Sequence, residues 1–156
     1  MAAPLVVEQS RVVPVGVDQA FHGTLPLPLP EIFDKWYGPI SPIKEVRGQT
    51  GNWDAPGQTR TLIMLGGSVR EELTSVDPPR SFGYRLTDIK GPMSLLVGSV
   101  TGEWNFDSAG SGTRISWRWT IYPKSSLAAP GLPLFGMLWK RYARRALGDL
   151  SEVLTG

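Results

Sequence analysis

The longest periodic segment of the chain is PLFGMLWKRYARRALGDLSEVL, residues 133–154. Its apolar residues recur every three or four positions, which is the spacing of one face of an α-helix. That face consists of Leu134, Leu138, Tyr142, Ala146, Leu150 and Val153, with Phe135 and Trp139 beside it. The pattern predicts a helix of about six turns, and its apolar stripe must be buried against another element.

The rest of the chain supplies that element as β-sheet. Segments rich in β-branched and aromatic residues alternate with turn residues such as glycine, proline, asparagine and aspartate. The predicted strands are 5–13, 43–47, 59–65, 69–76, 81–88, 95–106 and 114–122. Because short links join most consecutive strands, neighbours are expected to be antiparallel. The prediction is an α+β fold in which a seven-stranded antiparallel curved sheet wraps around the long C-terminal helix.

Two short helices are predicted between the first strand and the second. Residues 17–21 carry Asp18 near the start of a helix, where acidic side chains are favoured. Residues 31–37 follow Pro30 and precede Gly38, which are residue types that begin and end helices.

Strand 114–122 has the clearest two-faced pattern. Its odd positions are apolar and its even positions are polar: Ile115, Trp117, Trp119 and Ile121 against Arg114, Ser116, Arg118 and Thr120. Since successive side chains of a strand point to opposite faces, one face is dry and the other wet. The preceding strand contains Gly98 and Gly102, which allow either a bend or a close approach to the backbone.

Length and composition limit the classes of protein to consider. The 156 residues suit one domain, 1–156, and a domain of this size buries roughly 70% of its extended surface. The net charge of +2 is small and the cations are scattered, so nucleic acid is not an expected partner. With no cysteine and one histidine, no metal and no cofactor are expected.

The chain shows no targeting segment. The apolar run Leu5-Val6-Val7 is interrupted by Glu8, which makes it too short for a secretory signal. The charge-free stretch 125–139 contains two prolines and is shorter than the ~20 residues of a membrane-spanning helix. We therefore expect a cytoplasmic protein without a transmembrane segment.

The order of these elements resembles that of a known superfamily. The segments that carry the resemblance are 14–21, Asp34-Lys35-Trp36, 57–60, Glu71-Glu72-Leu73 before Asp77-Pro78-Pro79, Phe82-Gly83-Tyr84 and 112–117. In these the chain resembles the START-like (SRPBCC) superfamily, which has the helix-grip fold of START and Bet v 1-like proteins, and specifically its bacterial polyketide cyclase/dehydrase-type branch. The resemblance covers nearly the whole chain. It implies a deep cavity between the sheet and the C-terminal helix that takes hydrophobic or amphipathic small molecules, and it implies no shared catalytic set.

The candidates for catalysis are Glu72, Tyr84 and Arg85. Glu71 and Glu72 are adjacent in one strand and so point to opposite faces, which directs one of them inward. An inward glutamate with Arg85 across the sheet is either a polar handle for a ligand, a general base with a pKa raised by burial, or an ion pair at the rim. His22 ends the first short helix without a nucleophile motif nearby, which favours a helix-end role over catalysis.

Aromatic residues are the candidates for ligand binding. The side chains expected to line the cavity are Trp36, Tyr84, Trp104, Trp117, Trp119, Leu138 and Tyr142. Two indoles on one face of a strand, about 7 Å apart, are hard to pack against a helix without gaps, and such gaps suit an amphipathic aromatic guest. A stacking platform for nucleic acid would need cations on the same face as the rings, whereas in 114–122 they alternate to the opposite face.

The predicted C-terminal helix also carries a basic cluster. This cluster runs from Lys140 to Arg145 and follows the apolar stretch from Leu132 to Trp139. It is either a solvated helix face or a surface for peripheral contact with anionic lipid headgroups.

Three functions are consistent with this sequence. The first is binding or transport of a hydrophobic or amphipathic small molecule, such as a lipid, a polyketide or another aromatic compound. The second is a polyketide cyclase/dehydratase-like enzyme, for which one histidine and no cysteine leave little machinery. The third is a protein-interaction module whose cavity is filled by its own side chains. The volume of the cavity and the polar atoms that line it would distinguish them.

Overall fold

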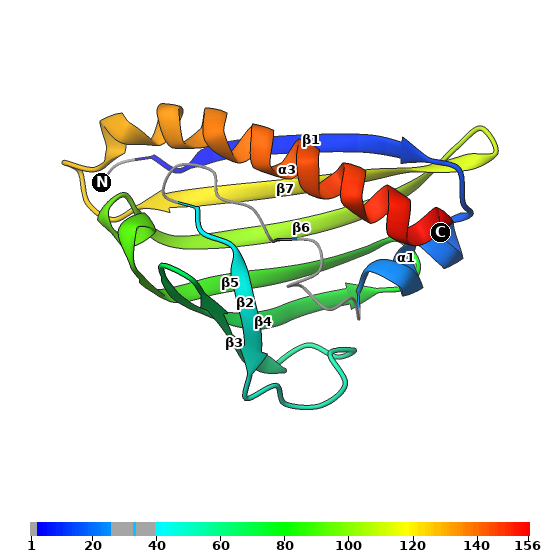
Figure 1. Ribbon diagram of the computed structural model, residues 1–156, viewed down its shortest axis with the longest axis horizontal. Helices are drawn as coiled ribbons and strands as arrows, with labels where there is room; N and C mark the ends of the chain where they lie inside the picture. Colours follow the sequence, from blue (N-terminus) through cyan, green and yellow to red (C-terminus); the bar gives the residue numbers. More distant parts are fainter. Residues whose placement is uncertain (1–2, 26–32, 34–39) are drawn as a thin grey trace.

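A strongly curved sheet and one long helix form the body of the structure (Figure 1). The computed structural model describes residues 3–25, 33 and 40–156. In chain order the elements are β1 (Leu5–Val13), α1 (Val17–Thr24), β2 (Ile43–Arg47), β3 (Thr59–Met64), β4 (Gly67–Asp77), β5 (Ser81–Lys90), the 3-10 turn η1 (Pro92–Leu95), β6 (Val97–Ala109), β7 (Gly112–Pro123), the 3-10 turn η2 (Ala129–Gly131) and α3 (Leu132–Thr155). As predicted, the seven strands form one antiparallel sheet. Its order is β1-β7-β6-β5-β4-β3-β2, so β2 to β7 pair consecutively and β1 pairs with β7.

The bounds of several predicted elements differ from those in the structure by one to three residues. The strand expected at 95–106 begins at Val97, because Pro92 opens the turn η1 in front of it. The first short helix extends to Thr24. Of the second predicted helix, 31–37, Phe33 is described, and the rest of that prediction, including Trp36, lies outside the described residues.

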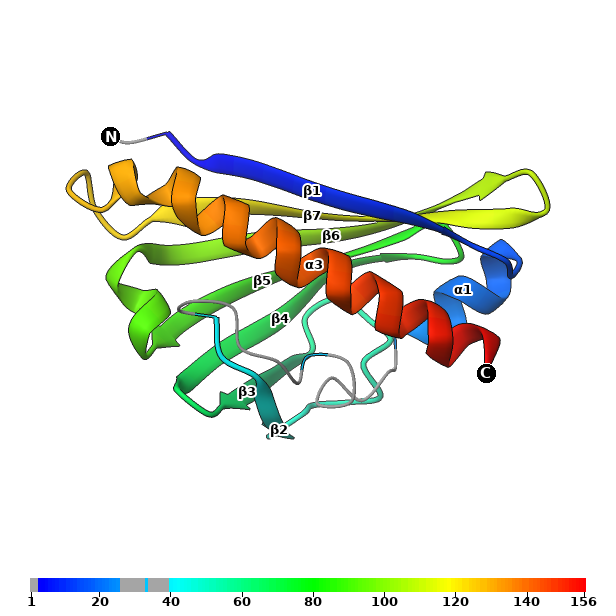
Figure 2. The ribbon, with the colours of Figure 1, turned by 45° about the horizontal axis from the view of Figure 1, so that its top comes forward.

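Helix α3 crosses the concave face of the sheet diagonally (Figure 2). The length predicted for it is confirmed, and the predicted buried face is correct in part, because Phe135, Trp139, Tyr142, Ala146 and Leu150 are buried. Leu134 is 65% exposed and Val153 is 46% exposed. The buried face contains Leu132, Phe135, Gly136, Trp139, Tyr142, Ala143, Ala146, Leu147, Leu150 and Leu154.

The rotation of α3 follows from its contact with β1, the strand on which it packs most extensively. A side chain at Gly136 would collide with Leu5 and Val7 of β1, at 2.8 and 3.1 Å from the added Cβ. Ala143, seven residues later, lies on the same side of the helix and is fully buried. The small residues therefore turn toward β1, and Leu134 is left in solvent.

The two-faced pattern predicted for 114–122 is confirmed in β7. Ile115, Trp117, Trp119 and Ile121 are all buried, while Arg114 and Arg118 on the opposite face are exposed. The apolar set faces the core that the sheet shares with α3 and α1. Burial of one face thereby fixes the register of β7 against both of its neighbours.

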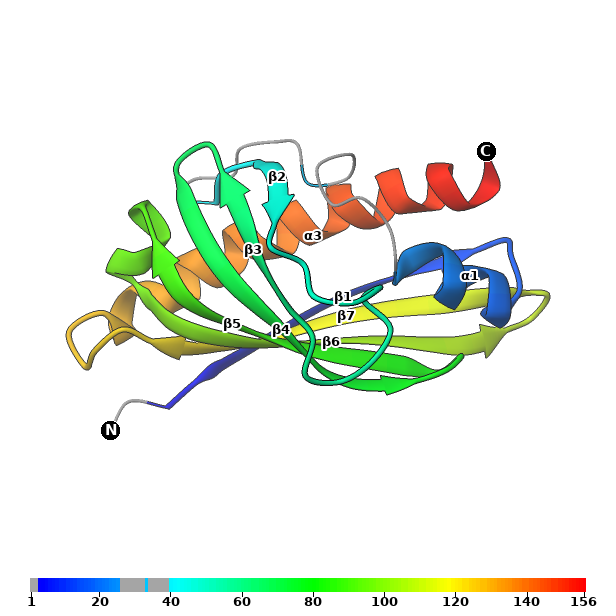
Figure 3. The same ribbon diagram turned by 90° about the horizontal axis from the view of Figure 1, so that it is seen from below.

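Helix α1 packs beside the C-terminal end of α3 (Figure 3). Phe21 is buried, and the side-chain amide of Gln19 donates a hydrogen bond of 3.1 Å to the carbonyl oxygen of Leu154. Within the described residues, no helix is both long and apolar enough to cross a membrane.

Candidate functional site

A cavity of about 70 Å³ lies between the concave face of the sheet and the helix α3. Half of the described side chains that line it are aromatic: Phe33, Trp53, Phe82, Tyr84, Trp104, Trp117, Trp119 and Tyr142. The polar side chains on its wall, besides the tyrosine hydroxyls and indole N–H groups, are Thr24, Arg60 and Glu71. The cavity therefore combines a broad aromatic wall with a few buried polar groups.

Most of the residues predicted to bind a ligand lie around this cavity. Tyr84, Trp104, Trp117, Trp119 and Tyr142 all line it, although they come from four different elements. Their role in ligand binding remains a prediction. Leu138 is half-buried and does not line the cavity, because the contact of α3 with β1 turns it aside.

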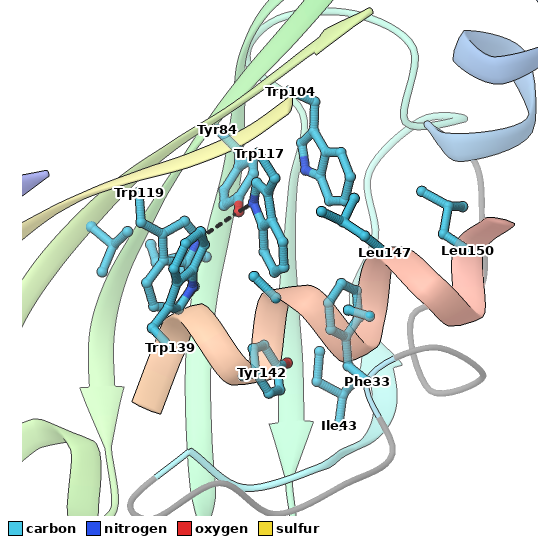
Figure 4. Packing of buried hydrophobic residues seen from close by; sticks show 14 of the residues in the cluster. Phe33, Ile43, Tyr84, Trp104, Trp117, Trp119, Trp139, Tyr142, Leu147 and Leu150 are labelled. Carbon is cyan, nitrogen blue, oxygen red and sulfur yellow. Dashed lines mark hydrogen bonds between the residues drawn. The ribbon is translucent and has the colours of Figure 1, made fainter. Parts of the chain in front are cut away.

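The aromatic rings stack on one another rather than standing apart (Figure 4). Trp104 and Trp117 stack with centroids 4.7 Å apart and 12° between their planes, and Trp119 meets Trp117 edge-on at 6.1 Å. Phe33 stacks on Tyr142 of α3 at 5.6 Å and lies 5.4 Å from Trp117. These contacts fill much of the space that gaps between indoles were expected to leave.

Tyr84 is the polar centre of this aromatic cluster. The indole N–H groups of Trp117 and Trp119 both donate hydrogen bonds to its hydroxyl oxygen, at 2.8 and 2.7 Å. Burial, reinforced by the nearby Glu71 carboxylate, raises the pKa of Tyr84, although the two indole hydrogen bonds and Arg60 lower it in part. The phenol therefore stays protonated throughout the physiological pH range.

Gly102 makes this arrangement sterically feasible. It pairs with Tyr84 across β5 and β6 and with Trp119 across β6 and β7. A Cβ atom at Gly102 would lie 2.1 Å from Cζ of Tyr84, so a side chain there is incompatible with the ring position. Of the two roles that the sequence allows for this glycine, a bend or a close approach, the structure shows a close approach, and the approaching group is the Tyr84 ring.

A buried ion pair forms the second polar feature of the wall. Nε of Arg60 donates a hydrogen bond of 2.6 Å to Oε1 of Glu71, and both side chains are almost completely buried. The guanidinium lies 3.9 Å from the centroid of the Trp53 ring, and its Nη1 donates to Gln49 at 3.4 Å. Burial raises the pKa of Glu71, and Arg60 opposes that rise through its charge and its hydrogen bond.

Two predicted catalytic candidates do not reach the cavity. Glu72 and Arg85 are paired across β4 and β5, but their side chains are on the convex face, where Arg85 is exposed. The inward position of β4 belongs to Glu71, which alternates with the buried Val69 and Leu73. Its partner is Arg60 of β3 rather than Arg85.

Arg60 was missed by sequence reasoning, although a signal for it was present. Arg60 and Leu62 alternate along β3, so a cation occupies a position of the apolar face. A charged residue of each sign on the inner face of adjacent strands indicates a buried pair.

His22, the one histidine of the chain, does not line the cavity. His22 is exposed at the end of α1, and its Nδ1 lies 3.0 Å from the carbonyl oxygen of Asp18, consistent with a helix-end role. Among the residues that the structure describes, no three histidine or acidic side chains gather as they would around a metal ion.

The outer face of α3 is apolar near the start of the helix and positively charged further along it. Leu134 and Met137 are exposed near its start, at 65% and 57%. The exposed cations that follow are Lys140, Arg141, Arg144 and Arg145. With Arg11 of β1, the three arginines line an open groove toward the C-terminal end of the helix.

Comparison with known proteins places these features in context. A family model described as "Polyketide cyclase / dehydrase and lipid transport" matches residues 4–155. A search of curated proteins finds no match. Among solved structures, the chain resembles the Zhui aromatase/cyclase from Streptomyces sp. R1128 (15% identity, TM-score 0.71, 97% of this chain and 94% of that chain), the major latex-like protein 151 from Panax ginseng (11%, 0.71, 96% and 97%) and Ara h 8.0201 (16%, 0.68, 98% and 99%). At these identities the likeness is one of fold.

Proposed function

The chain belongs to the polyketide cyclase / dehydrase and lipid transport family, and from this premise we propose that it binds a hydrophobic or amphipathic small molecule between the sheet and α3. A lipid, a polyketide or another aromatic compound fits the chemistry of the wall. The observation that carries the proposal is the cavity itself, in which aromatic rings surround a buried hydroxyl and a buried ion pair. Ligand sites are typically apolar with a few convergent polar groups.

The volume of the cavity sets a condition on binding. About 70 Å³ is small beside the roughly 300–1,000 Å³ of sites for drug-sized ligands. A ligand must therefore displace side chains on entry. Phe33 is the proposed movable wall, because it belongs to neither a helix nor a strand and contacts α3 and β7 through single ring contacts, stacked on Tyr142 and tilted against Trp117.

Titration followed by tryptophan emission tests this proposal. Trp104, Trp117 and Trp119 line the cavity, so a bound aromatic compound should change their emission saturably. Trp117→Ala should weaken binding, whereas Val153→Ser, at an exposed position of α3, is the matched control and should leave it unchanged. Unchanged emission with fatty acids, polyketides, quinones and flavonoids would instead favour the interaction module with a filled cavity.

An enzymatic role of the cyclase or dehydratase kind is the second candidate. It is favoured by the presence of a carboxyl group and a phenol on the same cavity wall. In that case the Glu71 carboxylate would remove a proton next to a substrate carbonyl, and the Tyr84 hydroxyl would donate a hydrogen bond to the carbonyl oxygen. Turnover of a poly-β-ketone by the wild type that is lost in Glu71→Gln, with the matched control Glu72→Gln active, would establish it.

Peripheral membrane contact is proposed for the outer face of α3. Exposed Leu134 and Met137 precede a run of exposed cations, a combination suited to an anionic bilayer surface. Co-sedimentation with phosphatidylserine vesicles should fall in Leu134→Ser/Met137→Ser and at high salt. Equal sedimentation of both proteins would count against it. The cytoplasm remains the proposed compartment, which fractionation of cells would test.

A further inference from the structure

The hydrogen bonds of Tyr84 have a direction that the chemistry of its partners fixes. An indole N–H is a donor and never an acceptor, whereas a phenol offers one donor and two acceptor positions. The bonds from Trp117 and Trp119, at 2.8 and 2.7 Å, therefore occupy both acceptor positions of the hydroxyl. The hydroxyl hydrogen of Tyr84 is then the one group left on it that can form a further hydrogen bond.

No acceptor for that hydrogen is found among the residues that the structure describes. The Glu71 carboxylate is close enough to influence Tyr84 electrostatically, but its hydrogen bond is to Arg60. Tyr84 lines the cavity, and its side chain is buried from bulk solvent. Since an unmade hydrogen bond in a buried site is unfavourable, an acceptor inside the cavity should satisfy it.

The packing around Tyr84 holds its hydroxyl in one place. The ring lies over the backbone of Gly102, where a Cβ atom would come within 2.4 Å of the hydroxyl oxygen. Trp104 stacks on Trp117 at 4.7 Å, and Trp139 of α3 lies 5.5 Å from Trp119, so both donor indoles are themselves held by other rings. A donor fixed in this way recognises an acceptor at a defined position.

Resting on the proposed function, we propose that Tyr84 determines which ligands the cavity takes, by donating its O–H to an acceptor oxygen on the ligand. An aromatic ketone or quinone presents such an oxygen and brings no donor of its own. An aromatic hydrocarbon leaves the Tyr84 donor unpaired. An alcohol brings a hydrogen that Tyr84 has no free acceptor position to receive.

Matched probes of nearly equal shape test this selectivity. 1-Indanone, indane and 1-indanol would be titrated calorimetrically, and the carbonyl stretch of ¹³C-labelled 1-indanone would be recorded by infrared difference spectroscopy. In the wild type, 1-indanone should bind about 2- to 10-fold more tightly than indane, the range of one neutral hydrogen bond. Its carbonyl stretch should shift to lower frequency on binding. In Tyr84→Phe both the preference and the shift should disappear.

A second variant keeps the test independent of how well Tyr84→Phe folds. Trp119→Phe retains the hydroxyl but removes one of its two donors, so Tyr84 regains a free acceptor position. The affinity of 1-indanol relative to 1-indanone should then rise at least about 2-fold over the wild-type ratio. Val153→Ser, at an exposed position of α3, serves as the control that should change neither ratio.

The outcomes distinguish the role of Tyr84 in selectivity from the proposed binding of small molecules in the cavity. Equal binding of 1-indanone and indane by the wild type, with an unshifted carbonyl stretch, overturns the role of Tyr84 and leaves small-molecule binding standing. An unchanged alcohol-to-ketone ratio in Trp119→Phe also overturns it. If none of the three probes binds the wild type, the proposed function fails for small aromatic compounds, and the role of Tyr84 fails with it.

Discussion

Replacing Arg60 with methionine should be among the most destabilising single changes in this protein. The side chains of Arg60 and Glu71 are 6% and 7% exposed, so the variant leaves a carboxylate buried without its cation. Removing one partner of a buried ion pair costs about 3–5 kcal/mol. Loss of the Arg60 contact with Trp53, at 3.9 Å, acts in the same direction. We expect the free energy of unfolding, measured by urea denaturation at pH 7, to fall by about 3–5 kcal/mol.

The loss should depend on pH with a defined sign. Arg60 lowers the pKa of Glu71, so its removal raises that pKa further above the ordinary value of about 4.3. A carboxyl group with a raised folded-state pKa contributes stability that is present below the unfolded-state value and is lost as the pH rises through the folded-state value. The deficit of Arg60→Met should therefore be largest at neutral pH and shrink as the pH falls toward 4.

Two further variants test the reasoning. Arg118 forms an ion pair of 3.2 Å with Glu8, but both side chains are nearly half exposed, so Arg118→Met should cost at most about 1 kcal/mol. Arg60→Met/Glu71→Leu removes both buried charges and should be close to neutral, or more stable than the wild type. If Arg60→Met costs no more than Arg118→Met, the Arg60 pair is not desolvated and the reasoning is refuted.

Three other changes probe the packing around the site. Gly102→Ala should displace the ring of Tyr84, break both indole hydrogen bonds and lower stability by about 1–3 kcal/mol; an unchanged urea midpoint would contradict this. Gly136→Ala should be destabilising because its Cβ meets Leu5, whereas Gly148→Ala in the same helix has its nearest neighbour at 3.8 Å and should gain about 0.5–1 kcal/mol; equal effects would argue against the observed packing of α3. Because the pKa of Tyr84 is raised, its contribution to stability is present below pH ~10 and lost above it, so unfolding free energies above pH 10 should fall faster for the wild type than for Tyr84→Phe.

The architecture could be predicted from the sequence because its signals are local. Alternation in 114–122, turn residues between strands and the long periodicity of 133–154 each depend on residues close together in the chain. The rotation of the last helix could not be read in this way. It depends on the contact of Gly136 with β1, more than 120 residues earlier, and both Leu134 and Phe135 fit the helical spacing equally well.

Local patterns also explain why the aromatic residues of the cavity could be predicted from the sequence and the buried ion pair could not. The aromatic wall of the cavity follows from alternation within single strands, so the sequence already directs Trp117 and Trp119 to the concave face, where they line the cavity. The polar pair depends on the register between β3 and β4, which brings Arg60 opposite Glu71 and puts Glu72 on the other face. Burial of a charge is disfavoured unless it is paired, so an inward arginine becomes plausible only when its partner strand is known.

Three polar groups of the cavity wall lie together on three neighbouring strands. Glu71 lies opposite Leu86 and Leu73 lies opposite Tyr84, so Glu71 and Tyr84 are diagonal neighbours on the concave face of β4 and β5. Arg60 extends this polar group onto β3, while Tyr142 and Leu150 face it from α3. A buried ion pair adds little to stability that a well-packed apolar pair would not supply. Under the proposed function, the pair would instead contribute to recognition. An amphipathic molecule with an acceptor at one end would then be held with its polar end toward β3 to β5 and its apolar end toward the helix.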